Sequence, residues 1–296
     1  MTSPSAPPTV VLTGATSGIG RLAAIELARQ GAHIVFVARS ESKAAETRRA
    51  IGLAAPGARV DVVFGDLAIL ADVARVAAEI AAAHERIDVL VNNAGIHAFD
   101  QRVTVEGLSE MVAVNYVAPW LLTNILRERL AASAPSRVVT VASEASRQSS
   151  GLVPDLDLRD TAPFSRLGSS RAYGKTKLMD IMFSKELARR LEGTRVAVNC
   201  LCPGFNVTGL GRELGFASPL ASVLNWLKIG DPSRGAGIIV RLARAPEFAV
   251  RTGGYFSVKD AAPLTPVAPG NDPVLQQELW ATTAAFVATR VGLDFS

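Results

Sequence analysis

Short apolar runs alternate with longer segments of helical periodicity along most of the chain. The runs are rich in valine, isoleucine and leucine and lack a polar–apolar alternation, which is typical of parallel strands covered on both faces. Strands are predicted at residues 9–13, 33–38, 59–65, 88–93, 137–143 and 195–202. Helices are predicted at residues 20–31, 42–54, 70–84, 172–192 and 272–290, with two more between 104 and 132. Such repeated strand–helix units predict an α/β fold with a doubly wound parallel sheet and helices on both faces.

Two segments interrupt this alternation. Residues 144–171 are polar and are predicted to form a long insertion-like loop. Residues 205–232 contain glycine, proline and aromatic side chains, and long loops in compact domains are commonly functional. No linker or internal repeat divides the chain, so residues 1–296 are predicted to form a single domain of the Rossmann type.

Composition limits the classes of partner. Charged residues make up 20% of the 296 residues and hydrophobic ones 49%, which is a globular composition. The net charge is +4, but lysines and arginines are scattered, so no nucleic-acid-binding surface is expected. No apolar stretch reaches the roughly 18 residues of a membrane span. The opening MTSPSAPP lacks the features of a secretory signal, and we therefore expect a cytoplasmic protein.

Cysteine and histidine usage gives no sign of metal chemistry. Cys200 and Cys202 are the only cysteines in the sequence, and a bridge between them would be strained, so we expect free thiols. The three histidines lie far apart in the sequence, and neither a CxxC nor an HExxH pattern occurs. No metal site is predicted.

A glycine-rich segment, TGATSGIG at 13–20, lies between the first predicted strand and the first predicted helix. Glycines allow the backbone to approach a pyrophosphate, and a helix N-terminus offers free N–H groups to the phosphates. An ordinary glycine-rich turn is the alternative. The candidate cofactor-binding residues of this loop are Gly14, Thr16, Ser17, Gly18, Ile19 and Gly20.

The end of the second predicted strand indicates which dinucleotide binds. NAD-binding folds tend to carry an acidic residue there, which accepts a hydrogen bond from the adenosine 2′-hydroxyl. Here Ala38 and Arg39 take that place, and Arg21 follows the glycine loop. A guanidinium suits a 2′-phosphate, so the sequence favours NADP(H), with Arg39 as the main contact. The alternative is that both arginines are ordinary surface residues.

A tyrosine and a lysine stand four residues apart in the segment AYGKTKL at 172–178. Residues i and i+4 share one face of a helix, so the Tyr173 hydroxyl and the Lys177 ammonium can meet. A cation beside a phenol favours the phenolate and lowers its pKa from about 10. The alternative is a half-buried tyrosine beside a solvated lysine. Lys175, between the two, is expected to point elsewhere, into solvent.

Taken in order along the chain, several motifs resemble those of the short-chain dehydrogenase/reductase family. They are TGATSGIG at 13–20, GDL at 65–67, NNAG at 92–95, Asn115, Ser143, YGKTK at 173–177 and PG at 203–204. The segment at 172–191, GGYF at 253–256 and LW at 279–280 resemble the retinol-dehydrogenase-like and WW-domain-oxidoreductase-like branch. The resemblance covers nearly the whole chain.

The resemblance implies a catalytic tetrad of Asn115, Ser143, Tyr173 and Lys177. Tyr173 would donate a proton to a carbonyl oxygen as hydride leaves the nicotinamide. Lys177 would lower the pKa of Tyr173 and bind the nicotinamide ribose. Ser143 would bind the substrate oxygen, and Asn115 would hold a water that connects Lys177 to solvent. Further cofactor contacts would come from Asp66, Leu67, Asn93, Ala94, Gly95, Pro203, Gly204, Val207 and Thr208.

The reaction implied is reduction of a ketone or aldehyde, or oxidation of the matching alcohol. Residues 205–232 are predicted to form a substrate lid. Apolar side chains such as Trp226 dominate it, and its charges form no clamp, so a bulky, largely apolar substrate is expected. Glu144 either hydrogen-bonds a substrate hydroxyl or faces solvent.

Two alternatives to this function are weighed. An epimerase or dehydratase of the same fold would usually carry a TGxxGxxG loop and a larger C-terminal part. A catalytically silent NADP(H)-binding regulatory protein typically loses at least one of the tyrosine, lysine and serine, which this chain keeps. Dimers and tetramers are frequent in the family, so a homodimer or homotetramer is a further expectation.

Overall fold

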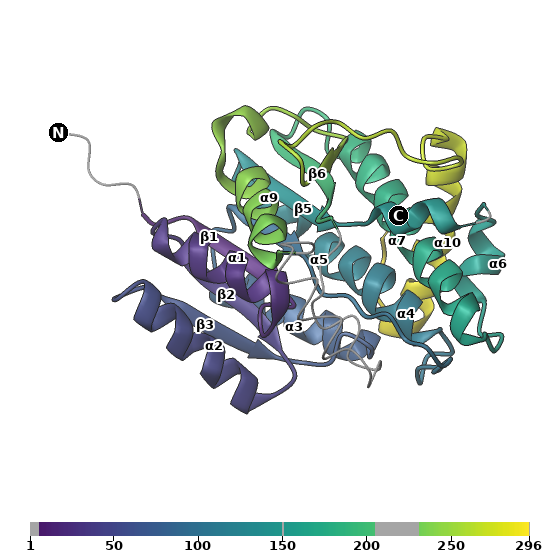
Figure 1. The fold of residues 1–296 in the computed structure, drawn as a ribbon, viewed down its shortest axis with the longest axis horizontal. Coiled ribbons are helices and arrows are strands. Elements are labelled where there is room, and N and C mark those ends of the chain that lie inside the picture. Colours follow the sequence, from purple (N-terminus) through teal and green to yellow (C-terminus); the bar gives the residue numbers. More distant parts are fainter. Residues whose placement is uncertain (1–5, 150, 205–230, 296) are drawn as a thin grey trace.

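A seven-stranded parallel sheet forms the centre of the computed structural model, which describes residues 6–149, 151–204 and 231–295 (Figure 1). The strands are β1 (Thr9–Thr13), β2 (His33–Ala38), β3 (Val60–Phe64), β4 (Val89–Asn92), β5 (Ser136–Val141), β6 (Val196–Cys202) and β7 (Gly254–Ser257). Their order across the sheet is β3-β2-β1-β4-β5-β6-β7. The order reverses between β1 and β4, so the predicted doubly wound sheet is confirmed.

Helices cover both faces of the sheet. One face carries α1 (Gly18–Arg29), α2 (Glu41–Ala54) and α9 (Pro232–Arg244), and the other carries α3 (Leu70–Ala83), α5 (Ala118–Ala132) and α7 (Arg166–Arg190). Alternate residues of β1 point to opposite faces of the sheet. Val10 and Leu12 pack on the face that carries α1, and Val11 packs on the other face. This division explains why the strands read as continuous apolar runs.

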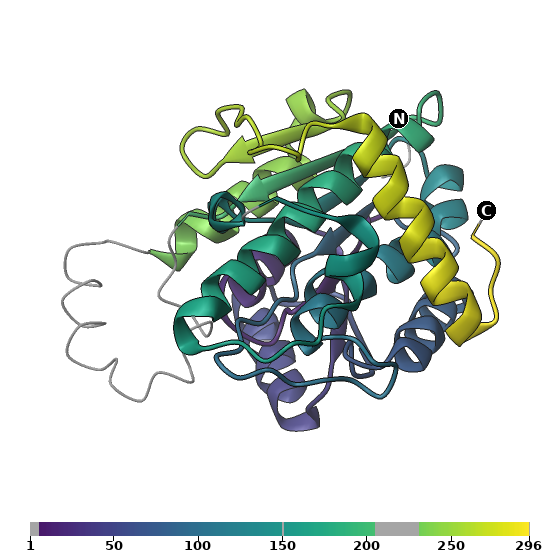
Figure 2. The same cartoon turned by 90° about the vertical axis from the view of Figure 1, so that its right-hand side faces the viewer.

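The C-terminal helix packs on the outer side of α7. Helix α10 (Pro273–Val291) crosses α7, with the indole of Trp280 stacked on the ring of Phe183 at 5.9 Å between centroids (Figure 2). The guanidinium of Arg190 lies 4.5 Å above the same indole. No helix among the described residues combines the length and the apolar character needed to cross a membrane.

The segment predicted as a long loop, 144–171, is largely helical. It contains a 3-10 helix, η2 (Glu144–Gln148), a short helix, α6 (Pro154–Arg159), and the first turn of α7, which begins at Arg166. Ser165 caps α7 by accepting a hydrogen bond from the Gly168 N–H at 3.2 Å. The prediction was wrong because these turns are polar and are held by caps and ion pairs, which leave no apolar period to detect.

Two further elements were not predicted. Helix α9 begins after Asp231, whose carboxylate accepts from the Ser233 N–H at 2.8 Å, and β7 adds a strand beside β6. Of the predicted lid at 205–232, residues 205–230, and with them Trp226, lie outside the described residues. At the other edge of the sheet, β3 pairs only with β2 among the described residues and is partly exposed, so the prediction that the strands are covered on both faces does not hold for this strand.

A close backbone contact joins α7 to the segment after β5. A Cβ atom placed on Gly174 would lie 2.5 Å from the Ala145 carbonyl oxygen and 3.3 Å from the Ser149 nitrogen. This distance is shorter than van der Waals contact, so only glycine lets α7 approach η2 so closely. The contact fixes Ser143, which precedes η2, relative to Tyr173 on α7.

Replacing Gly174 with alanine is therefore expected to destabilise the protein by about 1–3 kcal/mol, the usual cost of overpacking. Gly237→Ala is the matched control, because Gly237 also lies in a helix but has open space where a Cβ would go. That control should be stabilising by up to about 1 kcal/mol from helix propensity. Denaturant unfolding of both variants measures the difference, and equal stabilities would contradict the close contact.

Candidate functional site

The carboxyl ends of β1 to β6 surround a cavity of about 490 Å³. Loops that follow parallel strands meet at this edge of the sheet, which is where such folds bind ligands. The predicted residues that line the cavity are Gly14, Thr16, Ser17, Gly18, Ile19, Gly20, Arg39, Asp66, Leu67, Asn93, Ala94, Gly95, Ser143, Tyr173, Lys177, Pro203 and Gly204. Asn115 lies behind this lining, and Arg21 is not part of it. Val207 and Thr208 fall outside the described residues.

The glycine loop is locked to the end of β4. Gly14 has a φ of +69°, and a Cβ there would lie 2.7 Å from the Asn93 amide nitrogen. The Thr13 hydroxyl accepts from the backbone N–H groups of Asn93 and Ala94, each at 3.0 Å, and the Asn93 amide donates to the Thr13 carbonyl. Thr13 was not among the predicted site residues, although it opens the TGATSGIG segment.

Helix α1 begins directly at the cavity. Its N-cap, Ser17, makes no side-chain capping bond, and its first turn carries no acidic residue. The first N–H groups of the helix, with the positive end of its dipole, therefore point at the cavity without a protein anion to satisfy them. These features fit the pyrophosphate of a dinucleotide.

Basic side chains flank the adenosine end of the cavity. Arg39 follows β2, is largely exposed, and lies 3.6 Å from the Asp66 carboxylate. Lys43, in the first turn of α2, lines the same part of the cavity. Sequence reasoning missed Lys43, although it lies in the first turn of the helix that follows Arg39.

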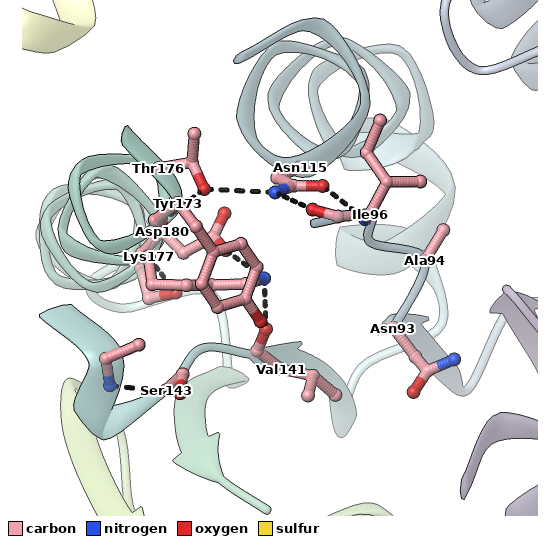
Figure 3. A network of polar contacts seen from close by, with 12 residues as sticks. Asn93, Ala94, Ile96, Asn115, Val141, Ser143, Tyr173, Thr176, Lys177 and Asp180 are labelled. Carbon is pink, nitrogen blue, oxygen red and sulfur yellow. Dashed lines mark hydrogen bonds and ion pairs between the residues drawn. The ribbon is translucent and has the colours of Figure 1, made fainter. Parts of the chain in front are cut away.

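A buried ion pair holds the lysine of the tyrosine–lysine pair (Figure 3). Lys177 Nζ donates to Asp180 Oδ2 at 2.8 Å and to the Val141 carbonyl at 2.9 Å, and it lies 5.8 Å from the centroid of the Tyr173 ring. Lys177 and Asp180 are 4% and 1% exposed, so neither charge is solvated. Asp180 was not predicted, although it stands three residues after Lys177, where an acidic residue can reach it.

Burial, and not the lysine, sets the direction of the tyrosine pKa. Desolvation raises the pKa of Tyr173 above its ordinary value, the Lys177 ammonium offsets part of that rise, and the Asp180 carboxylate adds to it. The predicted lowering of this pKa is therefore wrong for the free protein, because 9% exposure leaves a phenolate too poorly solvated. Burial also raises the pKa of Asp180, to about 6, against the effect of Lys177. Burial alone would lower the pKa of Lys177, but Asp180 and Tyr173 raise it.

Ser143 lies at the end of β5, close to Tyr173 (Figure 3). Its hydroxyl oxygen accepts from the Ala145 N–H at 3.1 Å, which leaves the hydroxyl proton to be donated elsewhere. The neighbouring Glu144 pairs within the protein, because one carboxylate oxygen accepts from the Tyr255 hydroxyl at 3.0 Å and the other from Arg147 at 2.6 Å.

Asn115 lies in a π-helical turn, η1 (Ala113–Val117), which runs on into α5. Its amide exchanges two hydrogen bonds with the backbone of Ile96, at 2.8 and 2.9 Å, and donates to the Thr176 hydroxyl at 3.0 Å. The hydroxyl of Thr176 in turn donates to the Tyr173 carbonyl. Asn115 thus ties the loop after β4 to α7 (Figure 3).

An aromatic stack borders the ring of Tyr173. The imidazole of His97 stacks on the Tyr173 ring at 4.8 Å between centroids with an interplanar angle of 17°, and the Phe99 ring lies 4.8 Å from the imidazole.

Lys175 does not point into solvent as predicted, because it forms an ion pair with the buried carboxylate of Asp157 in α6. Cys200 and Cys202 are free and buried, as predicted for the thiols.

Comparisons with known proteins agree with this geometry. Residues 8–154 match the family model described as short chain dehydrogenase. The chain is 36% identical over 286 residues to human retinol dehydrogenase 13, covering 94% of this chain and 84% of that protein. It is 34% identical over 279 residues to a Streptomyces protein provisionally named a daunorubicin C-13 ketoreductase, covering 94% and 92%. The Pseudomonas aeruginosa RhlG/NADP active-site complex has a TM-score of 0.67 and 25% identity, covering 86% of this chain and 95% of that one.

The charge of Asp180 is expected to keep the pKa of Tyr173 high, because it opposes formation of a phenolate nearby. Asp180→Asn should therefore lower the pKa of Tyr173. The difference in tyrosinate absorbance between this variant with and without Tyr173→Phe, followed against pH, measures that pKa. Asp157→Asn is the matched control, since it removes a buried carboxylate from another lysine, Lys175. An unchanged or raised pKa in Asp180→Asn would contradict this electrostatic role.

Proposed function

Because the chain belongs to the short-chain dehydrogenase family, we propose that it is an NADP(H)-dependent oxidoreductase that reduces a ketone or aldehyde on a bulky, largely apolar substrate, or oxidises the matching alcohol. One observation carries the proposal. Tyr173 and Lys177, on one face of α7, line the cavity at the carboxyl ends of the strands, together with Ser143, which follows β5. A proton donor, a cation and a hydroxyl thus meet where a nicotinamide would end.

Each residue of the site has its own role in carbonyl reduction. NADPH, when bound, supplies the hydride. The Tyr173 hydroxyl donates its proton to the carbonyl oxygen as that oxygen gains negative charge, while the Ser143 hydroxyl donates a hydrogen bond to the same oxygen. The Lys177 ammonium stabilises the phenolate left behind, and Asp180 keeps that ammonium charged and in place. A tyrosine that holds its proton at neutral pH suits a general acid.

Cofactor choice follows from the adenosine end of the cavity. Arg39 and Lys43 both reach the region that follows β2, where a 2′-phosphate would lie. The carboxylate of Asp66 follows β3 and lies within 3.6 Å of Arg39, so it holds the guanidinium there before the cofactor arrives. Two cations at this place support NADP(H) over NAD(H).

The substrate side supports an apolar ligand. Tyr173 belongs to a small cluster with Ala98 and Met111, against which Ile96, Ala145 and Phe164 pack. The aromatic stack of His97 and Phe99 extends this surface. Two relatives are named for retinol and for the C-13 ketone of daunorubicin, which are large molecules with an alcohol or a ketone.

Wild-type protein is expected to oxidise NADPH when given bulky apolar aldehydes or ketones. Tyr173→Phe should reduce turnover by at least the roughly 10²–10⁴-fold typical of general acid catalysis, with NADPH affinity near normal, because the ring is kept and only the proton donor is lost. Absorbance of NADPH over a panel of carbonyl compounds measures the first, and calorimetric titration of NADPH the second.

Tyr116→Phe is the matched control for that experiment. Tyr116 is also buried, but its hydroxyl bonds to Thr283 of α10, so its loss should cost about 1 kcal/mol of stability and leave turnover intact. A Tyr173→Phe enzyme with ordinary turnover would overturn the mechanism. Tight NADPH binding with no turnover of any carbonyl compound would favour a catalytically silent NADP(H)-binding protein instead.

Arg39→Asp is expected to weaken NADPH binding by roughly ten- to a hundred-fold, since loss of a charge-assisted phosphate contact costs about 1.5–3 kcal/mol. NADH should then bind relatively better, because the introduced carboxylate can accept from a 2′-hydroxyl. Arg29→Gln serves as control, because Arg29 is an exposed arginine that pairs with Glu26 at the far end of α1. Equal use of NADH and NADPH by the wild-type enzyme would show that the assignment of Arg39 is wrong.

A further inference from the structure

Two histidines and one aspartate, residue types that commonly bind metal ions, converge at the amino ends of the strands, opposite to the cofactor cavity. His33 Nε2 lies 2.7 Å from Asp61 Oδ2, and His84 Nε2 lies 3.9 Å from the same oxygen. The two imidazole rings stand 5.3 Å apart in an edge-to-face arrangement. One ligand atom from each residue lies within 4.8 Å of both others. Two histidines that are 51 positions apart in the sequence are thus neighbours in the fold.

The sheet and the helix above it bring these residues together. His33 opens β2, and Asp61 lies in β3 opposite Val35, so both side chains emerge on the face that α3 covers. Helix α3 ends above this pair, with His84 as its C-cap. Asp61 interrupts an otherwise apolar strand, which a core-packing role does not explain.

We propose that His33, Asp61 and His84 bind a divalent transition-metal ion of the zinc type. Two imidazole nitrogens and one carboxylate oxygen suit such an ion, whereas Mg²⁺ and Ca²⁺ prefer sites made of oxygen atoms alone. The three residues come from three different elements, so an ion bound here joins β2, β3 and α3.

Small adjustments complete the geometry. Bond lengths of about 2.0–2.2 Å in a tetrahedron place neighbouring ligand atoms roughly 3.3 Å apart. The 2.7 Å contact must therefore lengthen and the 3.9 Å contact shorten, and rotation of the Asp61 carboxylate changes both. That side chain is 50% exposed, whereas those of His33 and His84 are 5% and 10% exposed. The ligand atoms lie up to 4.8 Å from one another, so the two imidazole rings must also turn toward each other. The exposed side of Asp61 leaves the fourth position to water.

Electrostatics at this place act in both directions. The C-terminal end of α3 presents unpaired carbonyl groups and the negative end of the helix dipole, which favour a cation. Arg59, directly before β3, disfavours a bound cation, because its positive charge acts on His84. The Asp61 carboxylate is the negative group nearest to both imidazoles and offsets that repulsion.

The site is structural and not catalytic. It lies at the amino ends of β2 and β3, while the cofactor cavity lies at the carboxyl ends of the same strands. Strand β3 is the edge strand and is paired on one side only among the described residues. A bound ion would fasten this edge strand to α3, so binding should appear as stability and not as turnover.

The test uses the full-length protein without an affinity tag, after removal of metals with a chelator. Titration with Zn²⁺ by calorimetry and with Co²⁺ by visible absorption should show one equivalent bound, and Zn²⁺ should raise the midpoint of thermal unfolding. Asp61→Asn and His84→Gln should each weaken binding by more than about tenfold, the lower end of what loss of a merely supporting partner costs. Asp61→Asn keeps the shape of the side chain, and His84→Gln replaces the ring with a polar side chain of similar length, so circular dichroism is used to check that both variants fold.

His97→Gln is the matched control, because it removes the histidine that lies outside the cluster, and it should leave binding unchanged. A thiolate charge-transfer band in the Co²⁺ spectrum would place the ion at Cys200 or Cys202 and overturn the proposal. Absence of saturable binding of both ions, or full binding by Asp61→Asn, would overturn it as well. Loss of binding in Asp61→Asn and His84→Gln, with retention in His97→Gln, supports it.

Discussion

A buried ammonium is the constraint on which the rest of the site depends. Lys177 is 4% exposed, and an isolated charge at such a place would cost several kcal/mol. The protein meets that cost with one carboxylate, Asp180, and one backbone carbonyl, Val141, at 2.8 and 2.9 Å. The carbonyl belongs to the last residue of β5, so α7 must cross the sheet where β5 ends. Ser143 and Tyr173 come together for the same reason.

Further contacts hold α7 in position relative to the end of β5. Gly174 lets α7 approach the segment after Ser143, and Asn115 ties the loop after β4 to Thr176 on the same helix. Asp180 Oδ1 has no hydrogen-bond partner among the described residues, so the carboxylate makes its single strong contact with Lys177. A side chain that is buried and half-satisfied in this way costs stability and is kept for what it does to its neighbour.

The sequence predicted those parts of the fold that depend on apolar periodicity and on backbone freedom. Strands β1, β2 and β6 and the glycine loop at Gly14 follow from patterns within a few residues. The start of α7, helix α6 and the partner of Lys175 do not, because polar caps and an ion pair between residues 18 positions apart define them, and neither produces an apolar period. The direction of the Tyr173 pKa was wrong for a related reason. Lys177 and Asp180 are both visible in the sequence, whereas the depth of burial, which raises the pKa most, becomes clear only once the helix is packed. His33 and His84 likewise meet only through the strand register and the end of α3.

The outer position of α10 bears on quaternary structure. Trp280 covers Phe183, and Arg190 covers Trp280, so the side of α7 turned away from the sheet is already occupied within one chain. Two copies that paired by laying α7 against α7 would first have to displace α10 and expose a tryptophan and a phenylalanine on each chain. Self-association through the back of the catalytic helix is therefore disfavoured, and any homodimer of this protein has to be sought on another surface.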